Sequence, residues 1–150
     1  MSLKPILVGE HNPYGADPRA SLYPLPPSSA GGRLCRLILG MTTHEYLRAF
    51  ERVDLLRRLP WSARDAFESA RRLREVHMHD VGDDGRGRTY VLLGRRVANA
   101  FWPKAPMPGY DGERLVAIPH PSGLCRYWLE AGAIDRVRAV LREAGVPCAA

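Results

Sequence analysis

Two short polar segments hold residue types that can take part in acid–base chemistry. Residues 9–15 read GEHNPYG, and residues 120–124 read HPSGL. In the first segment, Glu10 is a carboxylate that can activate a water molecule or stabilise a cation. In the second, His120 can donate a hydrogen bond to a leaving group on which negative charge develops. The pair therefore predicts a functional site, provided that the fold brings the two segments together.

Each of these segments directly follows a run of apolar residues that is typical of a buried strand. Nearly continuous apolar runs indicate strands that are covered on both faces, as in a parallel sheet. The chain has such runs at residues 5–8, 53–56, 89–93 and 114–118. Ligands of open α/β sheets bind at the carboxyl ends of the strands. Both polar segments are therefore expected at the functional edge of the sheet.

Helical patterns lie between the expected strands. Residues 42–45 (TTHE) fit a capping box, and Ser62 begins a pattern whose expected inner face carries Phe67, Ala70 and Leu73. Further helices are expected over residues 32–39, 94–101 and 134–144, the last ending at Gly145. Strands that alternate with helices predict an α/β fold: a three-layer α/β/α sandwich with a central four-stranded parallel sheet.

The length and the charge of the chain limit the classes of protein to which it can belong. The chain has 150 residues, of which 45% are hydrophobic, and 22 Lys and Arg against 16 Asp and Glu give a formal net charge of +6. This length suits a single domain over residues 1–150. The positive charge weakly favours a polyanionic partner. Since no apolar run is long enough to span a bilayer and the N-terminus lacks a signal-peptide pattern, we expect a cytoplasmic protein that does not bind membranes.

Cysteine and histidine patterns predict neither a metal site nor a cofactor. Cys35, Cys125 and Cys148 are scattered and have no CxxC spacing, which argues against a disulfide framework or a four-cysteine metal site. His77 and His79 stand close together, but no cysteine or carboxylate follows at a spacing typical of metal ligands. We therefore expect a metal-free protein without a cofactor.

In this order, the two polar segments resemble the paired motifs of the uracil-DNA glycosylase superfamily, which read like GQDPY or GxNPG and like HPSPL or NPSGL. Residues 21–29 (SLYPLPPSS) resemble the superfamily's aromatic and proline-rich loop, and residues 89–101 resemble its strand and helix before the second motif. The resemblance spans residues 6 to about 128. It implies a monomeric, monofunctional DNA glycosylase that hydrolyses the N-glycosidic bond of a flipped-out base and leaves an abasic site.

The resemblance implies three catalytic residues. His120 matches the histidine that donates a hydrogen bond to a base carbonyl. Asn12 stands before the proline, where the family carries Asp or Asn to position the attacking water. Glu10 is the only acid of the first motif, which has one residue more between Gly9 and the proline than GQDPY has. Glu10, Asn12 or both, with His11 assisting, therefore position the water.

Four residues are expected to bind the base. Tyr14 matches the tyrosine that walls the pocket, Tyr23 matches the aromatic that stacks on the flipped base, and His11 lies between the catalytic candidates. Asp54 stands near the end of the second strand, where uracil-cleaving members usually have an Asn that reads the base edge. Either it alters the substrate, or it lies one position off the base and caps the following turn.

The protonation state of Asp54 bears on the substrate. An ionised Asp only accepts hydrogen bonds and so favours an exocyclic amino group, as on cytosine or its derivatives, whereas a buried, protonated Asp regains one donor. The expected substrate is therefore uracil or a related deaminated or modified base, and the alternatives are a modified cytosine or recognition of damaged DNA without cleavage.

The DNA partner, single- or double-stranded, is expected to contact a separate set of residues. Leu124 matches the apolar wedge that fills the gap left by the flipped nucleotide. Hydroxyl and backbone N–H groups around Ser28 and Ser122 are expected to hold phosphates, and Pro27 stiffens the loop of Ser28. Arg126 closely follows the wedge and is expected to contact a phosphate as well.

Overall fold

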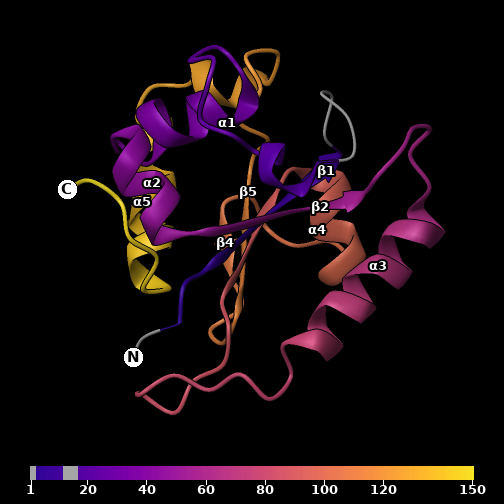
Figure 1. Cartoon of the computed structure of the whole chain (residues 1–150). Coiled ribbons are helices and arrows are strands. Elements are labelled where there is room, and N and C mark those ends of the chain that lie inside the picture. Colours follow the sequence, from indigo (N-terminus) through magenta and orange to yellow (C-terminus); the bar gives the residue numbers. More distant parts are fainter. Residues whose placement is uncertain (1–2, 12–16) are drawn as a thin grey trace.

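The structure, a computed structural model, describes residues 3–11 and 17–150. A five-stranded sheet in the order β2-β1-β3-β5-β4 lies between two helical layers (Figure 1). The broad α/β prediction is confirmed. The strands are β1 (Ile6–His11), β2 (Glu51–Leu56), β3 (Tyr90–Leu93), β4 (Gly109–Tyr110) and β5 (Leu115–Ile118).

The predicted four-stranded, all-parallel sheet is wrong because of one added edge strand. Strands β2, β1, β3 and β5 are parallel, but β4 pairs with β5 in the antiparallel direction, with Gly109 opposite Ala117. The chain reverses between β4 and β5 at Asp111. One oxygen of its carboxyl group accepts hydrogen bonds of 2.8–2.9 Å from three successive backbone N–H groups. These hydrogen bonds hold the turn between the two strands. Strand β4 is Gly109–Tyr110, which is too short to show as an apolar run in the sequence.

The helices divide between the two faces of the sheet. Helices α1 (Ala30–Arg33), α2 (Thr43–Ala49) and α5 (Ala133–Glu143) cover one face, and α3 (Ala63–Val76) and α4 (Arg95–Phe101) cover the other (Figure 1). A π-helical turn, η2 (Leu34–Ile38), continues α1, and short 3₁₀ turns form at η1 (Pro18–Ala20) and η3 (Arg126–Leu129). Within residues 3–11 and 17–150, no helix has the length and apolar character needed to cross a bilayer.

Local capping sets the helix starts that the sequence indicates. Thr42 and Glu45 form the predicted capping box at the start of α2, and the Ser62 hydroxyl accepts from the N–H of Asp65 at the start of α3. The predicted inner face of α3 is wrong at one position. Phe67 is 56% exposed, because Ala66 and Ala70 face the sheet instead.

The pleat of β1 decides which side chains can meet at its end. Ile6 and Val8 pack in the core beneath α3 and α4, whereas Leu7 packs in the core beneath α1, α2 and α5. Successive side chains of a strand point to opposite faces. Gly9 and His11 therefore continue the face of Leu7, and Glu10 continues the opposite face.

Candidate active site

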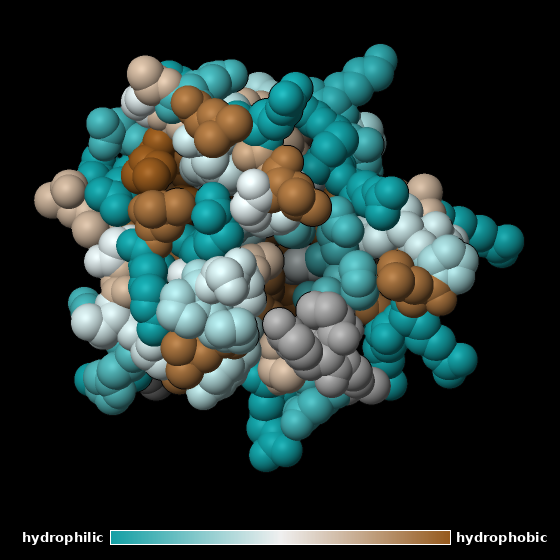
Figure 2. All heavy atoms as spheres, turned by 90° about the horizontal axis from the view of Figure 1, so that it is seen from above, coloured by the Kyte–Doolittle hydropathy of each residue, from teal (hydrophilic) through white to brown (hydrophobic). Residues whose placement is uncertain are grey.

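A cavity of about 360 Å³ opens at the carboxyl edge of the sheet. Figure 2 views this edge from above and shows apolar and hydrophilic residues interleaved over it. Strand ends supply one side of the lining and residues 20–31 supply the other. The lining residues are Gly9, Glu10, His11, Ala20, Leu22, Tyr23, Ser29, Ala30, Gly31, Asp54 and His120.

The cavity brings together the described residues that the sequence proposes for catalysis and base binding. Glu10, His11, Tyr23, Asp54 and His120 all line it. The expectation that the two polar segments meet at one site is therefore confirmed, while the role of each residue stays a prediction. Two further candidates, Asn12 and Tyr14, lie outside the described residues.

The two segments can meet because of what lies between them. Strand β3 separates β1 from β5 in the sheet and is followed by Gly94, whose φ of 93° is rarely adopted by other residue types. A Cβ atom at Gly94 would lie 3.1 Å from Cβ and 3.2 Å from Cδ2 of His120. The missing side chain thus leaves the space in which the His120 side chain lies. The cavity extends from here to the end of β1.

Two hydrogen bonds hold His120 in place. Its Nδ1 accepts a hydrogen bond of 3.1 Å from the N–H of Ser122, and its carbonyl oxygen accepts one of 2.7 Å from Nε1 of Trp128. Burial lowers the pKa of His120, and the nearby Glu10 charge partly opposes this effect. The ring is therefore held neutral near pH 7.

Glu10 points away from Asp54, toward the opposite face of the sheet. Its side chain is 21% exposed, and Oε2 lies 4.0 Å from Nη1 of Arg96 on α4. At that distance and with Arg96 59% exposed, the ion pair is weak. It leaves the carboxylate available at the rim of the cavity, where its charge acts on His120.

Asp54 lies in the wall of the cavity beside β1. It pairs with Gly9 in the sheet register, and a Cβ atom at Gly9 would lie 2.7 Å from Oδ1 of Asp54. Burial raises the pKa of Asp54, and a hydrogen bond from Ser21 partly opposes the rise. Asp54 therefore lines the cavity, and whether it alters the substrate stays a prediction.

Residues 21–29 form the opposite wall, and hydrogen bonds hold their backbone in place. The Tyr46 hydroxyl donates to the carbonyl of Leu22 at 2.7 Å, Arg36 donates to the carbonyl of Pro24 at 2.6 Å, and Arg52 donates to the carbonyl of Ser21 at 2.8 Å. Leu22 adopts a φ of 49°, which a non-glycine residue keeps only where neighbours hold it. The backbone of this wall is therefore held in place by contacts within the fold.

Tyr23 stands at the rim of this wall. It is 40% exposed, and the guanidinium of Arg52 lies 5.7 Å from the centre of its ring. Close packing beneath it comes from Gly31, where a Cβ atom would lie 2.2 Å from the carbonyl oxygen of Tyr23. Gly31 thus packs against the backbone of Tyr23, Arg52 lies over its ring, and Tyr23 lines the cavity.

The residues expected to contact DNA are exposed around the same edge. Leu124 is 92% exposed, and Pro27, Ser28 and Arg126 are also exposed. Ser122 is half-buried, and its hydroxyl oxygen accepts a hydrogen bond of 3.1 Å from the N–H of Leu124. None of these residues lines the cavity, and their contact with DNA stays a prediction.

Sequence reasoning missed several residues of the site. Leu22 lines the cavity, Gly94 leaves room for His120, and Trp128 anchors it. Arg33 donates from Nε to the carbonyl of Pro121 at 2.9 Å and ties α1 to the second polar segment. Only the glycine directly after the strand at residues 89–93 could have been noticed, since such a position often marks a close approach of the backbone.

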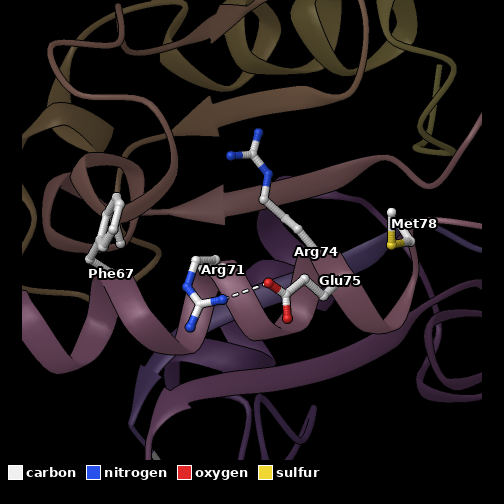
Figure 3. A pocket seen from close by; sticks show the side chains of 6 residues that line it. Phe67, Arg71, Arg74, Glu75 and Met78 are labelled. Carbon is white, nitrogen blue, oxygen red and sulfur yellow. Dashed lines mark hydrogen bonds and ion pairs between the residues drawn. The ribbon is translucent and has the colours of Figure 1, made fainter.

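A second hollow lies along α3, where this helix meets α4 (Figure 3). It has a volume of about 310 Å³ and contains none of the candidate residues. The exposed Phe67 and Met78 flank it, Arg71 pairs with Glu75, and Arg74 lies over the ring of Phe101. Because Arg71 and Arg74 already have these partners, we assign no catalytic or binding role to this hollow.

Among the described residues, no group of three or more His, Cys, Asp or Glu side chains is placed to hold a metal ion. Comparisons of the chain with protein-family models, curated proteins and solved structures find no significant match. The resemblance to the uracil-DNA glycosylase superfamily therefore rests on the motifs quoted above.

Proposed function

We propose that the protein is a monofunctional DNA glycosylase, which hydrolyses the N-glycosidic bond of an extruded nucleobase and leaves an abasic site. One observation carries the proposal. Glu10 and His120, which follow different strands, line one cavity that also has an aromatic ring, Tyr23, at its rim. A carboxylate, a neutral imidazole and an aromatic ring are the groups that this reaction uses.

His120 is assigned to the leaving base. Because Nδ1 accepts from the backbone of Ser122, the proton of the neutral ring is on Nε2. As the glycosidic bond breaks, its electron pair leaves with the base, and negative charge spreads to the base carbonyl. A hydrogen bond from Nε2–H to that oxygen strengthens as the charge grows, so it stabilises the transition state more than the ground state.

Glu10 is assigned to the sugar and the water. Its carboxylate stabilises the positive charge that develops on the sugar, and it accepts a proton from the water whose oxygen forms the new bond to C1′. The two groups act on opposite charges of one transition state. That both side chains line the same cavity supports this division of roles.

A panel of labelled oligonucleotides tests the proposal. Single and double strands containing uracil, hypoxanthine, xanthine, cytosine or hydroxymethylcytosine are incubated with the protein, and alkali then cleaves abasic sites. We expect scission at one or more of these bases. We expect Glu10→Gln and His120→Asn to lower the rate by about 100-fold or more, the usual contribution of a general acid–base or charge-stabilising group.

The same panel can also give results that contradict the proposal or one of its assigned roles. Full activity of Glu10→Gln would remove Glu10 from the mechanism. Retention of the oligonucleotides on the protein without scission would indicate recognition without cleavage. Lack of both scission and binding would contradict the proposal.

A further inference from the structure

One cation stands beside the carboxylate that is assigned to the sugar and the water. Nη1 of Arg96, in the first turn of α4, lies 4.0 Å from Oε2 of Glu10. Glu10 lines the cavity, whereas Arg96 does not line it and is 59% exposed to solvent. The ion pair therefore joins a group inside the cavity to a cation that a ligand can reach from outside.

An aromatic ring keeps Arg96 at this place. The guanidinium carbon lies 5.8 Å from the ring centre of Trp61, within the range of a cation–π contact. Trp61 is half-buried and packs against the core beneath α3 and α4. Among residues 3–11 and 17–150, Arg96 pairs with no acid except Glu10 and donates no hydrogen bond to a neighbour. The guanidinium is thus held in place while its N–H donors stay open to a ligand.

Arg96 opposes the effect of Glu10 on the reaction. Positive charge develops on the sugar in the transition state, and the carboxylate stabilises it. A cation beside this carboxylate acts on the same sugar with the opposite sign. Water screens an exposed pair of this length, so Arg96 cancels only a part of the stabilisation by Glu10. A free nucleoside, which carries no phosphate, meets Glu10 in this weakened state.

A nucleotide within a strand brings an anion of its own. A phosphodiester with one negative charge lies on either side of its sugar. The planar guanidinium of arginine matches a phosphate with two parallel N–H···O bonds, which are stronger than a single contact of 4.0 Å. A phosphate that binds Arg96 neutralises the guanidinium and places negative charge near Glu10. Both effects favour the positive sugar.

Resting on the glycosylase function proposed above, we propose that Arg96 makes the reaction specific for nucleotides within a strand: a phosphate beside the extruded nucleotide binds Arg96 in place of Glu10, and the full charge of Glu10 then acts on the sugar. No covalent bond forms or breaks in this exchange. Trp61 is the positioning residue, because its ring holds the guanidinium beside Glu10 before the phosphate arrives.

Two labelled single strands that differ only in charge test this inference. One contains a single uracil, or the base at which the oligonucleotide panel shows scission. In the other, methylphosphonates replace the two phosphates that flank the same nucleotide, so these linkages are neutral. The proteins are the wild type, Arg96→Gln, Arg96→Lys and Arg48→Gln. Arg48 is exposed in the last turn of α2 and serves as the matched control. All buffers lack inorganic phosphate, so only the strand supplies the anion.

The rate of cleavage reports on Glu10. It is measured in single turnovers with saturating protein, so that weaker binding does not lower it. On the neutral-linkage strand we expect Arg96→Gln to be faster than the wild type by about threefold, the scale of an exposed ion pair. On the phosphate strand the two proteins should agree within about twofold, because the phosphate already neutralises Arg96 in the wild type. A gain in rate cannot come from a damaged fold.

Binding, followed by fluorescence anisotropy, reports on the phosphate contact. The wild type should bind the neutral-linkage strand about tenfold more weakly than the phosphate strand, the scale of a hydrogen-bonded charge pair. This difference should be about threefold or more smaller in Arg96→Gln, which has lost the contact. Arg96→Lys keeps the charge and should stay closer to the wild type than to Arg96→Gln in both measurements. Arg48→Gln should match the wild type.

The contrary results are equally definite. The exchange is overturned if Arg96→Gln cleaves the neutral-linkage strand no faster than the wild type, if Arg48→Gln shows the same gain, or if Arg96→Lys behaves as Arg96→Gln. It is also overturned if the charge of the linkage affects binding equally in the wild type and Arg96→Gln. Absence of abasic sites with every base contradicts the glycosylase function instead, and the binding comparison then still decides whether Arg96 holds a phosphate.

Discussion

Nδ1 of His120 accepts a hydrogen bond of 3.1 Å from the backbone N–H of Ser122, two residues along the same turn. A ring nitrogen that accepts a hydrogen bond carries no proton, so the turn itself assigns the proton of the neutral imidazole to Nε2. Burial, which lowers the pKa of His120, favours the same neutral form. Backbone geometry and desolvation therefore act together to present a single N–H donor to the cavity.

Stability should depend on pH through His120. Its pKa is lowered in the folded state by burial, so the unfolded chain takes up a proton first as the pH falls below about 6.5. The free energy of unfolding then decreases with falling pH until the folded pKa is passed. Urea unfolding at pH 7.5 and pH 5.5 should show a decrease that is roughly 0.5 kcal/mol smaller in His120→Asn than in the wild type. The exposed His44 supplies the control, since His44→Asn should keep the wild-type decrease. Equal decreases in all three proteins would contradict the assignment.

Asp54→Asn should make the protein more stable at neutral pH. Burial raises the pKa of Asp54, so the stability that the neutral acid contributes at low pH is lost as the pH rises through the folded pKa. An amide avoids burial of a charge and still accepts from Ser21. We expect a gain of about 1 kcal/mol at pH 7, or roughly 2–4 °C in Tm, which shrinks toward pH 4. Thermal unfolding followed by circular dichroism at both pH values measures it, and a loss of stability at pH 7 would contradict it.

Gly9→Ala should damage both the fold and the cavity. Its Cβ would lie 2.7 Å from Oδ1 of Asp54 and 3.3 Å from two atoms of the Leu22 side chain, so β1, β2 and the opposite wall must separate. Overpacking of this kind costs about 1–3 kcal/mol. The matched change is Gly123→Ala, where the nearest atom is 3.8 Å from the added Cβ. Chemical denaturation should show a clear loss for the first variant and a change within about 0.5 kcal/mol for the second. Similar losses would mean that Gly9 is not closely packed.

Leu124→Ala should separate activity on a duplex from activity on a free nucleoside. Leu124 is 92% exposed, so truncation should change the free energy of unfolding by less than about 0.5 kcal/mol. If it fills the gap left by an extruded base, excision from a duplex should fall by about tenfold or more, while hydrolysis of a free nucleoside stays unchanged.

Leu129 provides the control for this experiment, because it is 84% exposed on the neighbouring turn η3 and has no proposed role. Leu129→Ala should keep the wild-type rate on both substrates. An equal loss in the two leucine variants, or no loss in either, would contradict the role of Leu124 as a wedge.

Much of the secondary structure could be predicted from local sequence. The buried parallel strands read as continuous apolar runs, and the hydroxyl side chains of Thr42 and Ser62 mark helix starts through hydrogen bonds within one turn. Strand β4 could not be predicted, because Gly109 and Tyr110 form no apolar run and owe their pairing to Leu115–Ile118. The exposure of Phe67 could not be predicted from the sequence either. Ala66 and Phe67 are neighbours on the helix, and only the sheet beneath α3 decides which of them faces inward.

For the candidate site, the sequence alone determined that two polar segments follow buried strands and that they carry Glu10 and His120. Such features depend on residues only a few positions apart. Only the tertiary structure decided that Asp54 lies beside Gly9 in the cavity wall and that Arg33 binds the carbonyl of Pro121, 88 residues away. Strand order, register and the packing of distant loops set these contacts. A residue's own neighbours along the chain do not contain that information.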